Sequence, residues 1–283
     1  MVKAKLIALM LLMATVTVAQ EKVNHLIYKS TNTVESKKGK EVTVGIGTEV
    51  NINDRQVVIT RLKEDGTLYE ALGNRIYDRK NGVVIYDNYK SKLYLVETFD
   101  SITGPVQKAK DLGKTATING YNCKAYGYSY TWKVDYKTVS KTNVVGVYDY
   151  VVWITQDIVT DEASQDQVLS SLTNNFARFD YKGTIVKLEY TFTTGNGKRS
   201  ADVVTELTKA NTSDKADKLA EMPWKRDDVK AMLPSEDAFG TSYTYTAESD
   251  FRIAFKRMRE LLTKITGIEK PKWIGVALPR PMF

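Results

Sequence analysis

Short runs of β-branched and aromatic residues, many of them alternating with polar residues, dominate the chain from about residue 23 to residue 207. Alternation with a period of two is typical of strands that bury one face, and such side chains favour a pleated, half-buried surface. The pattern predicts strands at 23–30, 42–47, 56–62, 83–87, 92–97, 121–132, 147–155, 184–193 and 201–207.

Turn signals separate these runs. Asn81-Gly82 and Asn119-Gly120 are the dipeptides that most strongly indicate a hairpin between two strands. Glu64-Asp65-Gly66 and Gly195-Asn196-Gly197 indicate two further turns. Because the connections leave little room for crossover helices, we expect an antiparallel sheet.

Three segments break the strand pattern and predict helices. Residues 161–179 carry apolar side chains at helical spacing after an acidic first turn. Residues 213–233 indicate two short helical pieces interrupted at Pro223. The clearest helix is 249–267, where seven apolar positions form one stripe and Gly267 is placed to end it.

Strand alternation also predicts where large side chains gather. Four aromatic residues share one face of 121–132, and two more share one face of 184–193. A twisted sheet with so much bulk on its inner face must cover that face with helices or curl around it. These side chains either fill a core or line a partly open apolar groove. The candidate ligand-binding residues are Tyr126, Tyr128, Tyr130, Trp132, Tyr190 and Phe192.

The chain has a single cysteine, Cys123, on the opposite face of the same strand. It belongs to a row of small side chains, with Ala125, Gly127 and Ser129. A buried thiol behaves as a small hydrophobe, and burial raises its pKa and reduces its reactivity. We expect Cys123 to be structural, and with no partner cysteine the fold must be stabilised by packing.

The first residues indicate export. Lys3 and Lys5 precede the apolar stretch Leu6 to Val18, which has the length of a signal-peptide core and is shorter than a membrane-spanning helix. We expect residues 1–19 to be a signal peptide cleaved before Gln20, leaving a periplasmic protein without a transmembrane segment; release outside the cell is the alternative. Without its two lysines the net charge falls from +7 to about +5, which does not suggest a nucleic-acid partner.

The sequence carries no catalytic signature. His25 is the only histidine and lies in a predicted strand, so a catalytic triad or a zinc site has few residues to draw on. No phosphate-binding or dinucleotide-binding glycine pattern is present. The acidic residues near 157–162 lack the spacing of a calcium loop. We therefore expect no enzyme, no metal and no cofactor, and an enzyme built on carboxylates is the third hypothesis.

Several stretches together resemble a secreted branch of unknown function within the outer-membrane lipoprotein-carrier (LolA/LolB-like) superfamily. The similarity runs from about residue 23 to residue 225, in the stretches 84–97, 115–128, 150–158, 185–192, 202–207 and 217–225. The resemblance implies a curved antiparallel half-barrel whose concave face, covered by helices, holds an acyl chain or a similar apolar ligand. Residues 161–179 and 226–283 are additions to that pattern.

The expected fold class is thus mainly β (α+β), with a half-barrel sheet covered by helices over 20–225, a helical insertion at about 161–179 and a C-terminal helical extension over 226–283. The helix at 249–267 either packs on the sheet or lies on an anionic membrane surface. The residues that would face a membrane or a partner are Arg252, Lys256, Arg259, Lys264 and Trp273.

Two functional hypotheses follow. In the first, an exported protein binds a hydrophobic or amphipathic ligand, such as a lipid or a lipoprotein acyl chain, in the concave face and serves cell-envelope lipid or lipoprotein handling. In the second, an envelope interaction or scaffold protein has a filled core and docks an envelope protein or a membrane through the basic helix 249–267.

Overall fold

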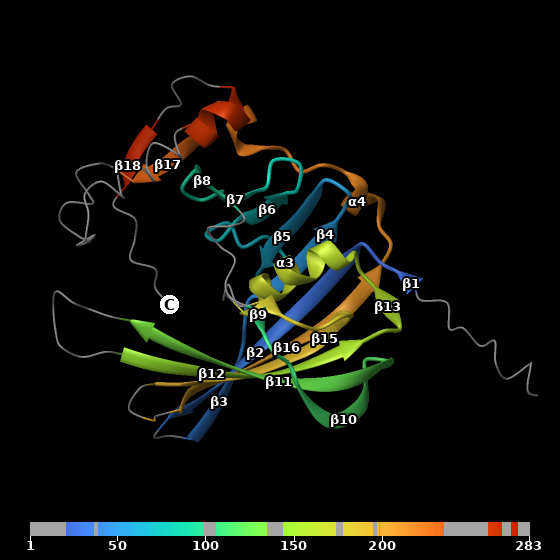
Figure 1. Ribbon diagram of the computed structural model, residues 1–283. Helices are drawn as coiled ribbons and strands as arrows, with labels where there is room; N and C mark the ends of the chain where they lie inside the picture. The colour runs from blue at the N-terminus through green and yellow to red at the C-terminus, as the bar shows by residue number, and fades with distance from the viewer. Residues whose placement is uncertain are drawn as a thin grey trace, which may run out of the picture.

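The computed structural model describes residues 21–36, 39–98, 106–134, 144–173, 178–194, 197, 199–234, 260–267 and 273–276 (Figure 1). The predicted signal peptide lies outside these residues, as do Arg252, Lys256, Arg259 and the greater part of the predicted helix 249–267.

Within the described residues, fourteen strands form one large sheet that curves around the helix α3 (Glu162–Thr173), as Figure 1 shows. The sheet order is β10-β11-β12-β15-β16-β2-β4-β5-β6-β7-β8-β17-β18, and β3 pairs with β2 beside this path. The expected fold class, mainly β with a curved sheet and few helices, is confirmed.

The sheet has two halves that meet at β2. One half contains β2 (His25–Ser36), β4 (Gly47–Ile52), β5 (Gln56–Leu62), β6 (Asn74–Asp78), β7 (Val83–Asn88) and β8 (Leu93–Thr98). The other contains β10 (Lys110–Ile118), β11 (Tyr121–Val134), β12 (Val144–Thr155), β15 (Thr184–Thr193) and β16 (Arg199–Asn211). All neighbours within these halves pair antiparallel, as the short connections predict.

The predicted hairpins form for local reasons. Asn119 and Gly120 have φ of 50° and 86°, the left-handed conformations that a two-residue hairpin turn requires. This turn brings Ile118 of β10 opposite Tyr121 of β11. Gly82, with φ 65°, lies in the turn between β6 and β7.

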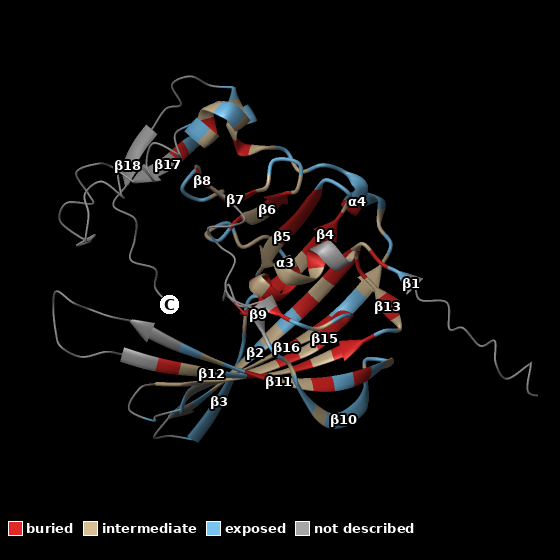
Figure 2. Ribbon diagram, in the orientation of Figure 1, coloured by how far each residue is buried: buried red, intermediate tan, exposed pale blue. Residues whose placement is uncertain are grey.

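The two faces of the sheet serve two cores because successive side chains on a strand point to opposite faces. Val57 and Ile59 of β5 belong to the core that includes Leu169 of α3, on the concave face. Val58, between them, belongs to a second core on the convex face, which includes Leu262 of the helical residues 260–266. Figure 2 shows the buried residues concentrated on the strands around α3.

The chain after β16 supplies the cover of the convex face. It contains α4 (Asp214–Asp217), the 3₁₀ turn η1 (Pro223–Lys225), β17 (Lys230–Pro234), the helical residues 260–266 and β18 (Trp273–Val276). Met222 and Trp224 pack against the convex core, and β17 extends the sheet beyond β8. The segment 212–234, which we call the C-terminal arm, is therefore part of the folded unit.

Three details differ from the sequence predictions. The run 42–47 is not one strand, since β3 (Gly39–Val44) ends there and β4 begins at Gly47; β3 and β4 lie along the same side of β2. The strands β6 and β10 were not predicted, and only the first residue of β4 lay in a predicted strand. The sheet is not purely antiparallel, because β17 pairs parallel with both β8 and β18.

Short parallel pairs also occur outside the main sheet. β1 (Glu21–Lys22) pairs with β13 (Ile158–Val159), and β9 (Val106–Gln107) pairs with β14 (Arg178–Phe179). The predicted helical insertion 161–179 is consequently shorter than expected: its helix is α3, and its last two residues form β14.

Candidate functional site

The centre of the concave face is filled by the protein's own side chains. Tyr28 and Tyr150 are almost completely buried there. The ring of Tyr128 stacks on that of Phe179 from β14, with centroids 3.7 Å apart and planes at 29°. Leu169 and Leu172 of α3 complete this core. An acyl chain cannot lie beneath α3 without displacing these residues.

Towards one end of the concave face the aromatic side chains become half-exposed. Tyr148 of β12 and Phe192 of β15 are directly opposite in the register, and their ring centroids are 4.5 Å apart. The ring centroid of Tyr190 lies 5.5 Å from that of Tyr150 and 6.2 Å from that of Tyr148. Tyr148, Tyr190 and Phe192 form a continuous surface of tilted rings, which we call the aromatic ladder.

A pocket of about 420 Å³ adjoins the ladder, and Tyr190 lines both. Its floor is the concave face of β2, β4, β5 and β16, and Leu172 of α3 forms one wall. The volume lies within the range of about 300–1,000 Å³ typical of small-molecule sites. The exposed apolar side chains of Val44, Ile46 and Leu72 form part of its lining.

The floor of the pocket is polar. The hydroxyl oxygens of Ser30 and Thr205 lie 2.8 Å apart, and Thr48 is almost fully buried beside them. Arg61 of β5 donates from Nη1 to Thr48 Oγ1 at 2.7 Å and from Nη2 to the Ser171 carbonyl of α3 at 2.5 Å. The guanidinium group therefore connects the sheet to α3 at the floor of the pocket.

A second arginine lies on the same face, one strand away. Arg75 of β6 is opposite Ile59 of β5, and its Cζ lies 5.0 Å from the ring centroid of Tyr86. Burial lowers the pKa of the Arg61 guanidinium to about 10, and the positive charge of Arg75 acts in the same direction. Burial raises the pKa of Glu97, although a hydrogen bond from Tyr86 and the charge of Arg75 oppose this.

Among the six predicted ligand-binding residues, those whose side chains the structure describes lie in different surroundings. Tyr128 is buried against Phe179, whereas Tyr190 and Phe192 belong to the aromatic ladder. Tyr130 is half-buried and pairs with Tyr148 in the register. Tyr126 is half-buried on β11, with the Lys124 ammonium 5.6 Å from its ring centroid. Trp132 lies on β11 opposite Gly146, and its side chain is outside the described part of the structure.

Cys123 is buried, as predicted, and is a free thiol. Burial is the main cause that raises its pKa. Gly127 of the same row is covered from within the chain, since a Cβ at this position would meet Leu112 of β10 at 3.0 Å. The small-residue row therefore holds no space for a ligand at this point.

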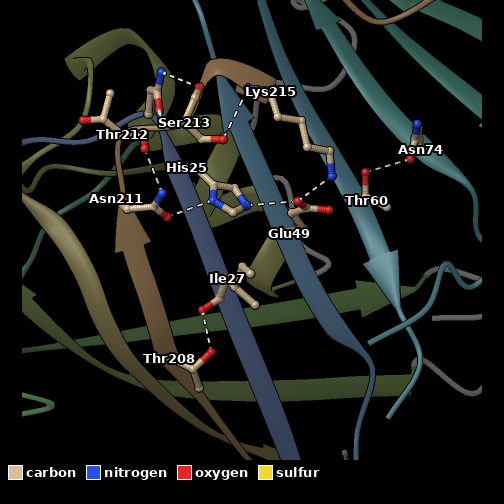
Figure 3. A network of polar contacts seen from close by, with 11 residues as sticks. His25, Ile27, Glu49, Thr60, Asn74, Thr208, Asn211, Thr212, Ser213 and Lys215 are labelled. Atoms are coloured by element: carbon tan, nitrogen blue, oxygen red, sulfur yellow. Dashed lines mark hydrogen bonds and ion pairs between the residues drawn. The ribbon is translucent and has the colours of Figure 1, made fainter. Parts of the chain in front are cut away.

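His25 is held in a structural network, which Figure 3 shows. Its Nδ1 lies 2.9 Å from Asn211 Oδ1, and its Nε2 lies 2.9 Å from Glu49 Oε1. Lys215 of α4 donates to the same Glu49 oxygen at 2.8 Å. The network joins β2, β4 and β16 to the C-terminal arm, and both His25 and Glu49 are largely buried in it.

A second pocket, of about 450 Å³, lies beside Lys22 and Asn24 near the start of the described chain. Arg79 and Asp161, which form an ion pair of 2.5 Å, both line it. None of the six predicted ligand-binding residues lies in this pocket.

The helical residues 260–266 pack on the convex core instead of exposing an apolar stripe. Leu262 is almost fully buried, and Leu261 and Ile265 pack against the same cluster. Lys264 is exposed, as a membrane-facing or partner-facing residue would be. Of the other predicted contact residues, Trp273 lies on β18 and its side chain is not described.

The comparisons with known proteins assign the chain to no family. No family model matches the chain, and no curated protein matches it. A crystal structure described as an outer-membrane lipoprotein-sorting protein domain from Vibrio parahaemolyticus overlaps 66% of this chain and 85% of its own, at 8% identity and a TM-score of 0.20. A TM-score of this size carries no information about function. In the part of the chain that the structure describes, no helix is long and apolar enough to span a membrane.

The polar floor was not predicted, although the sequence carries a signal for it. In 56–62 the alternation puts Val57, Ile59 and Arg61 on one face, so a charged residue occupies a position where the pattern requires an apolar one. A charged residue on the inner face of a strand is rarely buried without a specific reason.

Proposed function

We propose that this protein binds a hydrophobic or amphipathic ligand with an acyl chain, in the pocket beside the aromatic ladder. The observation that carries the proposal is that Tyr190 belongs both to the ladder and to the 420 Å³ pocket, so that apolar rings and a cavity form one surface. The helix α3 does not cover the aromatic ladder completely, because Tyr148, Tyr190 and Phe192 stay half-exposed.

Binding would be driven by removal of apolar surface from water, with about 0.8 kcal/mol for each buried methylene group. The aromatic rings offer a flat apolar contact along the chain, and the tyrosine hydroxyls keep a polar end towards solvent. The filled centre of the concave face limits the depth to which a chain can enter. The ligand would therefore occupy the open end and leave the Tyr128–Phe179 stack in place.

The proposal also covers where in the cell the protein acts and what kind of protein it is. The protein would be exported and act in the periplasm, in lipid or lipoprotein handling, as the signal-like first residues suggest. It would act as a binding protein and not as an enzyme. In support of this, His25, the one histidine of the sequence, is bound on both ring nitrogens within a structural network.

Binding can be tested by native mass spectrometry of the mature protein with oleate and with the uncharged ester monoolein. The proposal predicts one-to-one complexes that Val203→Trp abolishes, because Val203 lines the pocket and a larger side chain fills it. Val204→Trp is the matched control, since Val204 is adjacent on β16 and points to the other face. Failure of both ligands to bind the wild-type protein would refute the proposal.

The alternative, a scaffold that docks partners through the basic helix, has less support. Its apolar stripe would have to be available, yet Leu261, Leu262 and Ile265 pack on the convex core. The exposed Lys264 remains consistent with a surface for an anionic partner.

A further inference from the structure

The pocket contains a charged group that an acyl chain alone does not need. Arg61 lines the pocket together with Ser30, Thr48 and Thr205, and its Nη1 donates to the Thr48 hydroxyl. The guanidinium group keeps hydrogen bonds to Thr48 and Ser171, and a hydrocarbon chain lying on this floor would remove the group from water, which is costly for an ion. The polar floor therefore points to a ligand with a polar end.

The residues of the floor also indicate that the polar end of the ligand carries a negative charge. A guanidinium presents several N–H donors in a planar fork that matches the oxygens of a carboxylate or a phosphate. Arg61 is already positioned by Thr48 and Ser171, so little side-chain freedom would be lost on binding. Ser30 and Thr205 use one hydroxyl hydrogen for the bond between them, which leaves two of the three neighbouring hydroxyl groups able to donate a hydrogen bond to the ligand.

The surroundings of Arg61 favour an anion further. Arg75 is close enough on the same face that its charge disfavours the protonated form of Arg61. The charged form of Arg75 is stabilised by Tyr77, Tyr86 and Glu97. An anionic group in the pocket would relieve the repulsion between the two guanidinium groups. At the edge of the pocket, exposed Lys63 and Glu64 carry opposite charges and offset each other.

We propose that the pocket selects amphiphiles with one acyl chain and an anionic head, whose carboxylate or phosphate binds Arg61 while the chain lies along Tyr190 and the aromatic ladder. This inference rests on the proposed function, because it assigns the head group of the same ligand. It adds that an uncharged amphiphile with an identical chain is a poor ligand.

The test compares three probes with the same oleoyl chain, titrated against the mature protein: oleate, oleoyl lysophosphatidate and uncharged monoolein. Hydrogen bonds to a charged group contribute about 1.5 kcal/mol or more, so both anions should bind roughly tenfold more tightly than monoolein. Tight binding of oleate alone would identify a carboxylate ligand, and tight binding of lysophosphatidate alone a phosphate ligand.

Two variants test whether the preference for anionic probes depends on Arg61. Arg61→Met should reduce the preference for the anions to about twofold or less, whereas Lys29→Met, which removes an exposed charge on the opposite face of β2, should leave the preference unchanged. The wild-type comparison is independent of whether Arg61→Met folds. Equal affinity for all three probes would overturn the anionic head and leave acyl-chain binding intact, whereas no binding of any probe would overturn both.

Discussion

The guanidinium of Arg226, in the C-terminal arm, donates from Nη2 to both carboxylate oxygens of Asp87, at 2.5 and 2.6 Å. Asp87 is 1% exposed on β7, so this ion pair joins the arm to the convex face of the sheet at a buried point. Burial raises the pKa of Asp87, and the hydrogen bond and charge of Arg226 oppose that shift.

Removal of Arg226 should therefore destabilise the protein strongly. Arg226→Ala leaves a buried carboxylate without this cation, and the expected loss is about 3 kcal/mol in the free energy of unfolding, measured by urea denaturation. The matched control is Lys92→Ala, which removes the exposed ion pair between Lys92 and Asp228 at the same edge of the sheet. Equal losses for the two variants would mean that the Arg226–Asp87 pair contributes no more than a surface pair.

Because Phe179 stacks on Tyr128 in the filled core, its replacement should destabilise the protein more than replacement of Phe192, which lies at the half-exposed end of the concave face. Phe179→Ala should cost about 3–5 kcal/mol in the free energy of unfolding, because it opens a cavity in a packed core. Phe192→Ala, at the half-exposed end, should cost clearly less and instead weaken ligand binding. Urea denaturation and titration with oleate measure the two effects, and the reverse order would contradict the division into a filled centre and an open end.

The helical residues 260–266 should contribute to folding stability. Leu262→Ala removes a buried side chain from the convex core and should cost about 3 kcal/mol in the free energy of unfolding. Lys264→Ala, on the exposed side of the same helix, should change it little. If Leu262→Ala left stability unchanged but reduced binding to anionic vesicles, the membrane interpretation of this helix would be correct.

Glu49 should make stability depend on pH on the acid side. Burial acts to raise the pKa of Glu49, but hydrogen bonds from Lys215 and His25 outweigh it and hold the pKa below its ordinary value of 4.5. A carboxylate whose pKa is lowered on folding stabilises the native state above the unfolded pKa, and this contribution disappears as the pH falls through the folded pKa. The loss should therefore occur below about pH 4.5.

Urea denaturation between pH 7 and pH 3 tests this assignment. Glu49→Gln should flatten the acid-side loss of stability, and Lys215→Met, which removes one of the two donors, should flatten it in part. An acid-side slope identical in wild type and Glu49→Gln would show that other carboxylates cause it.

The strands were largely predictable because their side chains face two different environments. The run 56–62 coincides with β5, and 184–193 coincides with β15, since β-branched and aromatic residues end there at polar or glycine-containing turns. The break at Gly45 and Ile46 was not predictable from alternation. Gly45 lies close to the backbone of β2, where a Cβ would come within 3.0 Å of Ser30 Cβ, and this depends on a strand distant in sequence.

The candidate site was predicted only in part. Alternation placed Tyr190 and Phe192 on the inner face correctly, but it could not show that Phe179 fills the space in front of Tyr128. That contact comes from β14, a two-residue strand within the segment predicted to be helical. Arg61 was missed because a single charged residue in an apolar run was read as part of a strand and not as part of a site.

Photocrosslinking with a diazirine-labelled fatty acid, followed by peptide mass spectrometry, reports where on the protein an acyl chain lies. We expect crosslinks to β15 and β16 near Tyr190 and Val203 and to Leu172 of α3, and we expect unlabelled oleate to compete with all of them. Crosslinks confined to the convex face, or crosslinks in the pocket region that oleate does not compete, would contradict the proposed binding site.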